Sequence, residues 1–212
     1  MTTQIIAAFD FDGTITTRDT FVPFLYYAFG YPRVLKTFLR LAPRAFLVSV
    51  GLSSRDEFKE HLVHSLFFGE SVEKLRIVGA KYAKTLKPLY RLEALKRIKW
   101  HQSNGHRCIM VSASLDLYLK EVALSLGFDD LLCTVPSHND LVFDGFLRDG
   151  NCRCMEKVNR LRSLVGDLHT FEIFAYGDSI GDRDMIDHAK HGYYRPFLTN
   201  KALDIFKMKS DF

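Results

Sequence analysis

The sequence has few cysteines, and their spacing excludes the common cysteine-based sites. Four are present, and only Cys152 and Cys154 lie close together. One Cys-x-Cys pair without a second pair is a weak zinc signal, so we interpret these two cysteines as structural residues. Because no disulfide framework is evident, a reducing cytoplasm is the expected environment.

The sequence also lacks a targeting segment, internal repeats, low-complexity tracts and a flexible linker. The opening stretch MTTQIIAAFDFDG has no basic residues and meets an acid soon after its apolar run begins, so we expect no signal peptide. The net charge of +4 is too small to indicate nucleic-acid binding. Basic residues can still attract an anionic substrate or membrane surface, and the oligomeric state stays open.

The residues that are present indicate an α/β protein. The 212 residues are 47% hydrophobic and 25% charged, which suits one domain with a sizeable insertion. Short apolar segments typical of buried parallel strands lie at 5–9, 107–114, 131–135 and 171–179. Helical patterns between them predict βαβ units on a Rossmann-like parallel sheet. Residues 139–151 are expected to form a hairpin or an extended flap.

A long segment separates the first two predicted strands. Its roughly ninety residues exceed what one crossover connection needs, and residues 17–85 have helical patterns throughout. We therefore predict a helical cap, residues 17–85, inserted after the first strand. The catalytic core would consist of residues 1–16 and 86–212.

Three of the predicted strands end in polar side chains. Asp10 and Asp12 follow the first, Ser112 lies near the end of the second, and Asp178 closes the segment 171–179. Ligands of open α/β sheets bind at the carboxyl ends of the strands, so these side chains are expected to converge. Carboxylates as close as Asp10 and Asp12 repel each other and are costly to bury without a cation. The pattern therefore predicts a site.

Four motifs of the sequence resemble those of a known superfamily. They are DFDGT (10–14), Ser112 at a strand end, Lys157 at the start of a helix, and GDSIGD (177–182). In order and spacing they resemble the signature motifs of the haloacid dehalogenase superfamily of phosphohydrolases, over nearly the whole chain. The resemblance implies a Mg²⁺-dependent phosphatase. Phosphoryl transfer needs mainly positioning and charge neutralisation, which these residue types can supply.

The resemblance also implies roles for the acidic residues. Asp10 would be the nucleophile that forms an aspartyl-phosphate, and Asp12 the general acid and base. The expected Mg²⁺ ligands are the Asp10 side chain, the Asp12 backbone carbonyl and the Asp178 side chain, because this ion prefers oxygen ligands. Asp182 would be an auxiliary ligand or a support for the others.

Three further residues complete the expected site. Ser112 and Lys157 would hold phosphate oxygens, Lys157 as a point charge. Thr14 would brace the loop through hydrogen bonds. Taken alone, Ser112 would be interpreted as a helix N-cap and Lys157 as a surface lysine, but the order of the four motifs favours the site.

Within the superfamily, the large insertion resembles subfamily IB, the branch that contains phosphoserine phosphatase. The stretch DGNCRCMEKVNRL is similar to one in its phosphatidylglycerophosphatase C-like and CicA-like members, with Cys154 and Met155 in place of the usual Gly and Glu. Asp19 and Arg55 are candidates for the cap acid and arginine that phosphoserine phosphatase uses to read its substrate. We therefore expect both to influence substrate selectivity.

Residues 21–52 are rich in aromatic and aliphatic side chains and also carry a basic stripe. Arg33, Lys36, Arg40 and Arg44 recur at spacings of three or four. One interpretation is a cap helix with a solvated basic face and a buried apolar face. The other is a helix that lies on the anionic inner face of a membrane without crossing it. The expected substrate is accordingly a small phosphorylated metabolite, such as phosphoserine, or a phospholipid headgroup phosphate.

Two other interpretations come from different functional classes. A receiver-like phosphoacceptor module also gathers acids, a hydroxyl and a lysine around Mg²⁺, but it has no general acid two residues after the acceptor. A peripheral membrane-binding protein with a vestigial site is the second. The intact set of Asp10, Asp12, Ser112, Lys157 and Asp178 argues against it.

Overall fold

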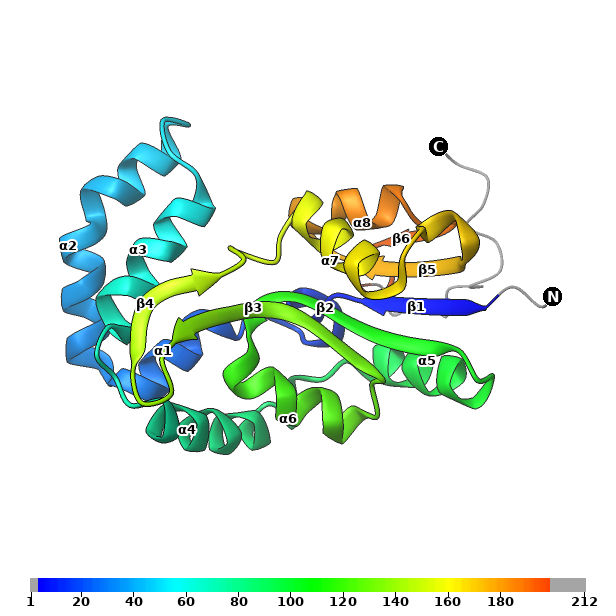
Figure 1. Cartoon of the computed structure of the whole chain (residues 1–212), viewed down its shortest axis with the longest axis horizontal. Helices are drawn as coiled ribbons and strands as arrows, with labels where there is room; N and C mark the ends of the chain where they lie inside the picture. The colour runs from blue at the N-terminus through cyan, green and yellow to red at the C-terminus, as the bar shows by residue number, and fades with distance from the viewer. Residues whose placement is uncertain (1–3, 199–212) are drawn as a thin grey trace.

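A computed structural model describes residues 4–198 and contains a six-stranded sheet with helices on both faces (Figure 1). The strand order is β4-β3-β2-β1-β5-β6, in which β4 alone runs antiparallel to its neighbour. The predicted α/β class is confirmed, and the expected hairpin is formed by β3 and β4, which residues 139–142 connect. The strands are β1 (Ile5–Phe9), β2 (Arg107–Leu115), β3 (Asp130–His138), β4 (Phe143–Arg148), β5 (Glu172–Gly177) and β6 (His191–Tyr194). The helices are α1 (Phe21–Phe29), α2 (Tyr31–Ser49), α3 (Arg55–Phe67), α4 (Val72–Thr85), α5 (Leu92–Ser103), α6 (Asp116–Leu126), α7 (Met155–Val165) and α8 (Arg183–Asp187).

Strand β1 is buried on both faces, as its unbroken apolar run predicts. Ile6 and Ala8 point into the layer formed with α7 and α8, whereas Ala7 and Phe9 point into the larger layer beneath α5 and α6. All four side chains are fully buried. The central position of β1 places the residues that follow it in the middle of the sheet edge.

Helices α1 to α4 lie between β1 and α5, and we call residues 21–85 the helical insertion. The chain segments that lead into it and out of it are paired. The Thr17 amide donates to the Leu89 carbonyl at 2.9 Å, and the Arg91 amide donates to the Ile15 carbonyl at 2.8 Å. The insertion therefore begins and ends at the same place on the core.

Close packing fixes α4 against α6. Gly79 of α4 lies so near the Leu117 backbone that an added Cβ atom would stand 2.1 Å from its carbonyl oxygen. The Tyr82 hydroxyl donates to the Thr20 carbonyl at 2.9 Å. No helix in the described part of the chain combines the length and apolar character that a bilayer crossing requires.

Helix α3 begins at a capping box that the sequence SRDE encodes. The Ser54 hydroxyl accepts from the Glu57 amide at 3.0 Å, and the Glu57 carboxylate accepts from the Ser54 amide at 3.3 Å. This start directs the first turns of α3 toward the carboxyl edge of the sheet, where Arg55, Asp56 and Lys59 line a cavity.

Candidate active site

The carboxyl ends of β1, β2 and β5 meet at one edge of the sheet, as the sequence predicts. Asp10 follows β1, Ser112 lies in β2, and Asp178 follows β5. All three line a cavity of about 720 Å³, and residues of α1, α2 and α3 also line it. Asp19 and Arg55 line the same cavity, so the structure brings both selectivity candidates to the site.

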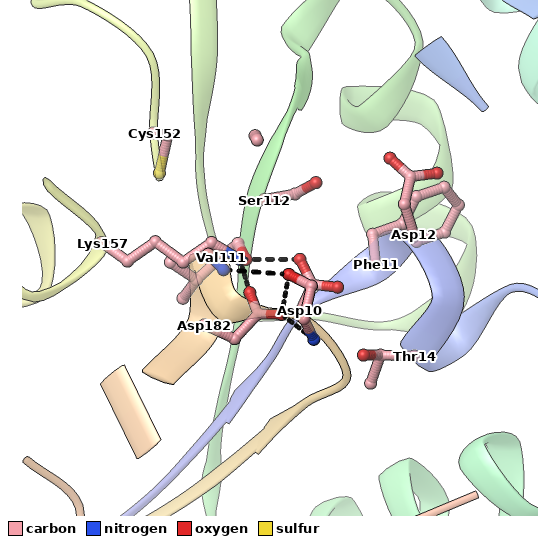
Figure 2. Close-up of polar contacts among 12 residues, drawn as sticks. Asp10, Phe11, Asp12, Thr14, Val111, Ser112, Cys152, Lys157 and Asp182 are labelled. Atoms are coloured by element: carbon pink, nitrogen blue, oxygen red, sulfur yellow. Dashed lines mark hydrogen bonds and ion pairs between the residues drawn. The ribbon is translucent and has the colours of Figure 1, made fainter. Parts of the chain in front are cut away.

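A buried lysine connects two of the acids. The Lys157 Nζ donates to Asp10 Oδ1 at 2.7 Å, to Asp182 Oδ1 at 2.6 Å and to the Val111 carbonyl at 2.8 Å. Its side chain is only 1% exposed. Figure 2 shows Lys157 reaching Asp10 from one side while Asp12 lies on the other. All three ammonium protons therefore have acceptors.

Burial and charge act in opposite directions in this group. Burial and the nearby Asp182 charge raise the pKa of Asp10 well above its usual range, although Lys157 opposes them. Burial also works against ionised Asp182, but the Lys157 charge and hydrogen bonds from Lys157 and Ser179 lower its pKa overall. Burial likewise penalises charged Lys157, and the two acids outweigh it and raise its pKa. Asp182 and Lys157 thus form a stable ion pair, while Asp10 still lacks compensating positive charge.

Asp10, Asp178 and Asp182 offer carboxylate oxygens that lie within 4.8 Å of one another, and this is the one such group in residues 4–198. Burial raises the pKa of Asp178 as well, and the Thr14 hydroxyl lies 3.5 Å from its Oδ1. Asp182 already binds Lys157 and Ser179 with both its oxygens. Asp10 and Asp178 are therefore the carboxylates that most need a cation.

Asp12 is held by groups that the sequence analysis did not identify. Its Oδ1 accepts from the Thr20 amide at 2.8 Å and the Thr20 hydroxyl at 2.6 Å, and its Oδ2 accepts from the Ser114 hydroxyl. Burial and the nearby Asp19 charge raise the pKa of Asp12 to about 6, against these hydrogen bonds. The sequence signal for Ser114 is its position two residues after Ser112 in the stretch SAS, on the same face of the strand.

The turn after β1 needs a glycine. Gly13 has a φ of +78°, and an added Cβ atom there would lie 2.3 Å from Asp178 Oδ2. A side chain would be strained and would also displace Asp178. The glycine of the DFDGT motif thus lets the turn after Asp10 lie close to Asp178.

The loop before α7 contains one departure from the superfamily pattern, at Cys154. Cys154, which stands where a glycine is usual, has a φ of +52° and a ψ of −133°, a conformation that glycine adopts more easily. Its amide donates to the Gly181 carbonyl at 2.8 Å. Lys157 is nevertheless positioned at Asp10. Cys152 is fully buried, and neither cysteine belongs to the acidic group.

Ser112 is also positioned at the cavity. Its side chain is buried, and its hydroxyl accepts from the Ser114 amide at 3.1 Å. The site also includes Lys59 of α3 and Asn151, which the sequence analysis missed, and they are joined by a hydrogen bond of 2.7 Å.

Comparison with known families agrees with this arrangement. A family model described as haloacid dehalogenase-like hydrolase matches residues 7–187. The chain belongs to this family. The predicted superfamily is thereby confirmed, and with it the expectation that the protein is a hydrolase.

Individual proteins are similar to this one over most of the chain. Protein CicA of Caulobacter vibrioides (strain NA1000 / CB15N) is 35% identical over 201 residues, which cover 93% of this chain and 89% of CicA. A protein of unknown function from Bordetella pertussis Tohama I has a TM-score of 0.73 at 20% identity, covering 88% of this chain and 87% of its own. A substrate-bound phosphoserine phosphatase has a TM-score of 0.59 at 18% identity, covering 92% and 86%. The two solved structures share the fold.

Proposed function

We propose that the protein is a Mg²⁺-dependent phosphomonoesterase that works through an aspartyl-phosphate on Asp10. The observation that carries the proposal is the position of the Asp10 carboxylate, which borders the cavity with Lys157 on one side and the Asp12 carboxyl on the other. The substrate would be a small phosphorylated metabolite or a phospholipid headgroup phosphate.

The donor set fits Mg²⁺. Asp10 and Asp178 supply oxygen ligands whose raised pKa values a divalent cation would reverse, and the Asp12 carbonyl is the third expected ligand. Asp182 would support them from its bonds to Lys157 and Ser179. A bound Mg²⁺ would neutralise the repulsion between these carboxylates and a phosphoryl group.

The protein groups would divide the reaction into two displacements. An Asp10 carboxylate oxygen attacks phosphorus, and the ester P–O bond breaks as Asp12 gives a proton to the leaving oxygen. Asp12 then takes a proton from a water molecule that attacks phosphorus, which releases orthophosphate and restores Asp10. A carboxyl with a pKa of about 6 can serve both as acid and as base near neutral pH. Ser112 would hold a non-bridging oxygen, and Lys157, whose three protons already have acceptors, would act on the phosphoryl group as a nearby positive charge.

The first experiment is release of orthophosphate from a panel of esters, with and without Mg²⁺. The panel contains phosphoserine, other small phosphomonoesters, and phosphatidylglycerophosphate in mixed micelles. We expect release that requires Mg²⁺ and stops when it is chelated. No release from any ester would contradict the proposal. A long-lived acyl-phosphate in acid-quenched samples would instead favour the receiver-like interpretation.

We also propose that residues 17–85 act as a cap domain over a core of residues 1–16 and 86–212, with Asp19 and Arg55 reading the substrate. The Asp19 carboxylate accepts from the Val22 amide at 3.1 Å at the start of α1, and Arg55 is exposed at the start of α3. Asp19→Asn and Arg55→Met should change the order of preference within the panel. An unchanged order would contradict these roles.

A second proposal concerns α2, which we infer to lie on the anionic inner face of a membrane. Part of its apolar surface is buried, but Leu35, Leu39 and Phe46 form a second stripe that is 55%, 68% and 65% exposed. The exposed Lys36 and Arg40 lie beside this stripe. A partly exposed apolar stripe beside basic residues favours an anionic lipid surface over a helix whose apolar face is entirely buried.

Sedimentation with vesicles tests the membrane proposal. We expect binding to vesicles that contain phosphatidylglycerol and much weaker binding to pure phosphatidylcholine. The double variant Leu39→Ser/Phe46→Ser should lower the affinity more than about tenfold. Leu124→Ser, on the 78% exposed Leu124 of α6, is the matched control. Binding that ignores lipid charge, or that survives in the double variant, would contradict the proposal.

A further inference from the structure

Lys59 is a lysine of the helical insertion whose amine is buried at the cavity wall. Its Nζ donates to the Ala113 carbonyl of β2 and, at 2.7 Å, to Asn151 Oδ1. It also lies 4.7 Å from the centre of the Phe21 ring. The residue is 9% exposed and lines the cavity.

The partners of this ammonium group are all formally neutral. No carboxylate oxygen in residues 4–198 lies within 4.0 Å of the Lys59 Nζ, whereas Lys157 has two acids as partners. A buried charge without a direct counter-ion is costly, and burial lowers the pKa of Lys59 to about 8, although the more distant charges of Asp12, Asp19 and Asp56 oppose it. An anion that enters the cavity would remove this cost.

The position of Lys59 relative to Lys157 is set by β2. Lys157 contacts the Val111 carbonyl and Lys59 contacts the Ala113 carbonyl. Two residues of a strand span about 7 Å, and here β2 also shifts its register against β3, between Ser112 and Leu115. If Lys157 marks the transferring phosphoryl group, Lys59 therefore lies one substituent farther along the cavity.

A hydrogen-bond network holds the Lys59 partner in place. Asn151 Oδ1 also accepts from the Thr134 hydroxyl at 2.8 Å, and its amide donates to Asp56 Oδ1 at 2.6 Å. Because Asn151 is oriented from both sides, the Lys59 ammonium is held in place before any ligand arrives. Preorganised charges bind ligands without paying much ordering entropy.

We propose that Lys59 binds a second anionic group of the substrate, a carboxylate or a phosphate, distinct from the phosphoryl group that is transferred. This proposal rests on the proposed phosphatase function. It extends that function by adding a specificity residue that contacts the substrate beyond its reacting phosphate. The substrate class is then a phosphomonoester that carries a further negative charge near the ester.

The test compares esters that differ in one charge. The pairs are 3-phosphoglycerate with glycerol 3-phosphate, and phosphoserine with phosphoethanolamine, in which the first member has an additional carboxylate. We expect the wild-type enzyme to have the higher kcat/KM for the anionic member of at least one pair. In Lys59→Met that preference should fall more than about tenfold. Lys74→Met, an exposed lysine of α4, should keep the wild-type ratio.

The outcomes separate the possible roles of Lys59. Equal losses for both members of each pair would mean that Lys59 contacts the transferring phosphate or only supports the fold, and would overturn the proposal. A wild-type enzyme without preference for the added charge would overturn it too. If no ester is hydrolysed, the phosphatase function fails by itself. In that case titration calorimetry with Mg²⁺ measures the affinities of the same pairs. The ratio of affinities within a pair, compared between the wild-type protein and Lys59→Met, then tests the role of Lys59.

Discussion

The core edge and the outer face of α2 in the helical insertion differ in how their side chains are held. Asp10, Asp182 and Lys157 are at most 8% exposed and bonded to one another, whereas Leu39 and Phe46 of α2 are 68% and 65% exposed. Changes on an exposed helix face cost little stability, while changes in a buried ion network cost much. We infer that the core fixes the reaction and that the insertion is free to vary the substrate.

The largest expected effect is on the core side. Asp10→Asn should lower kcat by more than about 10³-fold, because the amide cannot act as the nucleophile. The near-identical shape should leave the far-UV circular dichroism spectrum unchanged. Turnover is measured on whichever ester the panel selects. Retained activity would show that Asp10 is not the nucleophile and would contradict the catalytic role of the core edge.

Stability gives the next contrast. Lys157→Met leaves Asp10 and Asp182 buried without their cation, so the free energy of unfolding should fall by about 3–5 kcal/mol. Lys81→Met, on the exposed face of α4, should change it by less than about 0.5 kcal/mol. Urea denaturation measures both variants. Similar losses for the two lysines would erase the difference between core and insertion.

A third prediction extends the contrast to the interior of the core. His101 of α5 is fully buried between the Tyr176 hydroxyl, 2.9 Å from its Nε2, and His106, 2.8 Å from its Nδ1. Burial first, and then the charges of His106 and Arg97, lower its pKa from 6.5 to about 3. The unfolded chain therefore binds a proton below pH 6.5 that the folded chain refuses until about pH 3. The free energy of unfolding should therefore fall as the pH is lowered from 6.5 toward 3, by at most about 1.4 kcal/mol per pH unit.

Denaturation midpoints between pH 7.5 and 5 measure this effect. His101→Phe should flatten the dependence, although it also removes two hydrogen bonds. His188→Gln, an exposed histidine, should leave the slope as it is. An unchanged slope in His101→Phe would assign the pH dependence to other groups.

The smallest expected effect is a gain. Cys154→Gly should raise the free energy of unfolding by about 1 kcal/mol, because the positive φ of residue 154 strains a cysteine more than a glycine. Greater freedom of the unfolded glycine chain offsets part of that gain. Urea denaturation detects it. A loss of stability would mean that the cysteine side chain contributes more through packing than its backbone strain costs.

The fold and the acids of the site could be predicted because their signals are local. The apolar run before Asp10 gives the central strand, and a parallel sheet brings the strand ends together whatever the loops do. Thr20 and Lys59 could not be found in this way. Their roles depend on how α1 and α3 pack over the core, which is set by long-range contacts such as Gly79 against Leu117.

The exposed stripe of α2 illustrates the same limit. The sequence indicates a helix with apolar and basic faces, but it does not say which apolar residues find a partner. In the structure Val34 and Leu41 are buried, while Leu35, one position after Val34, and Leu39, two positions before Leu41, are exposed. Neighbouring helices decide this division.

The paired segments at the base of the helical insertion have a consequence for how such proteins diversify. Because the Thr17 and Arg91 amides bond to the Leu89 and Ile15 carbonyls, the chain enters and leaves the insertion through a closed, hairpin-like stem. The length of chain above such a stem adds little to the cost of closing the loop, which grows only slowly with size. Helical insertions of different lengths can therefore be joined to the core at this stem without moving the acids at the edge of the sheet.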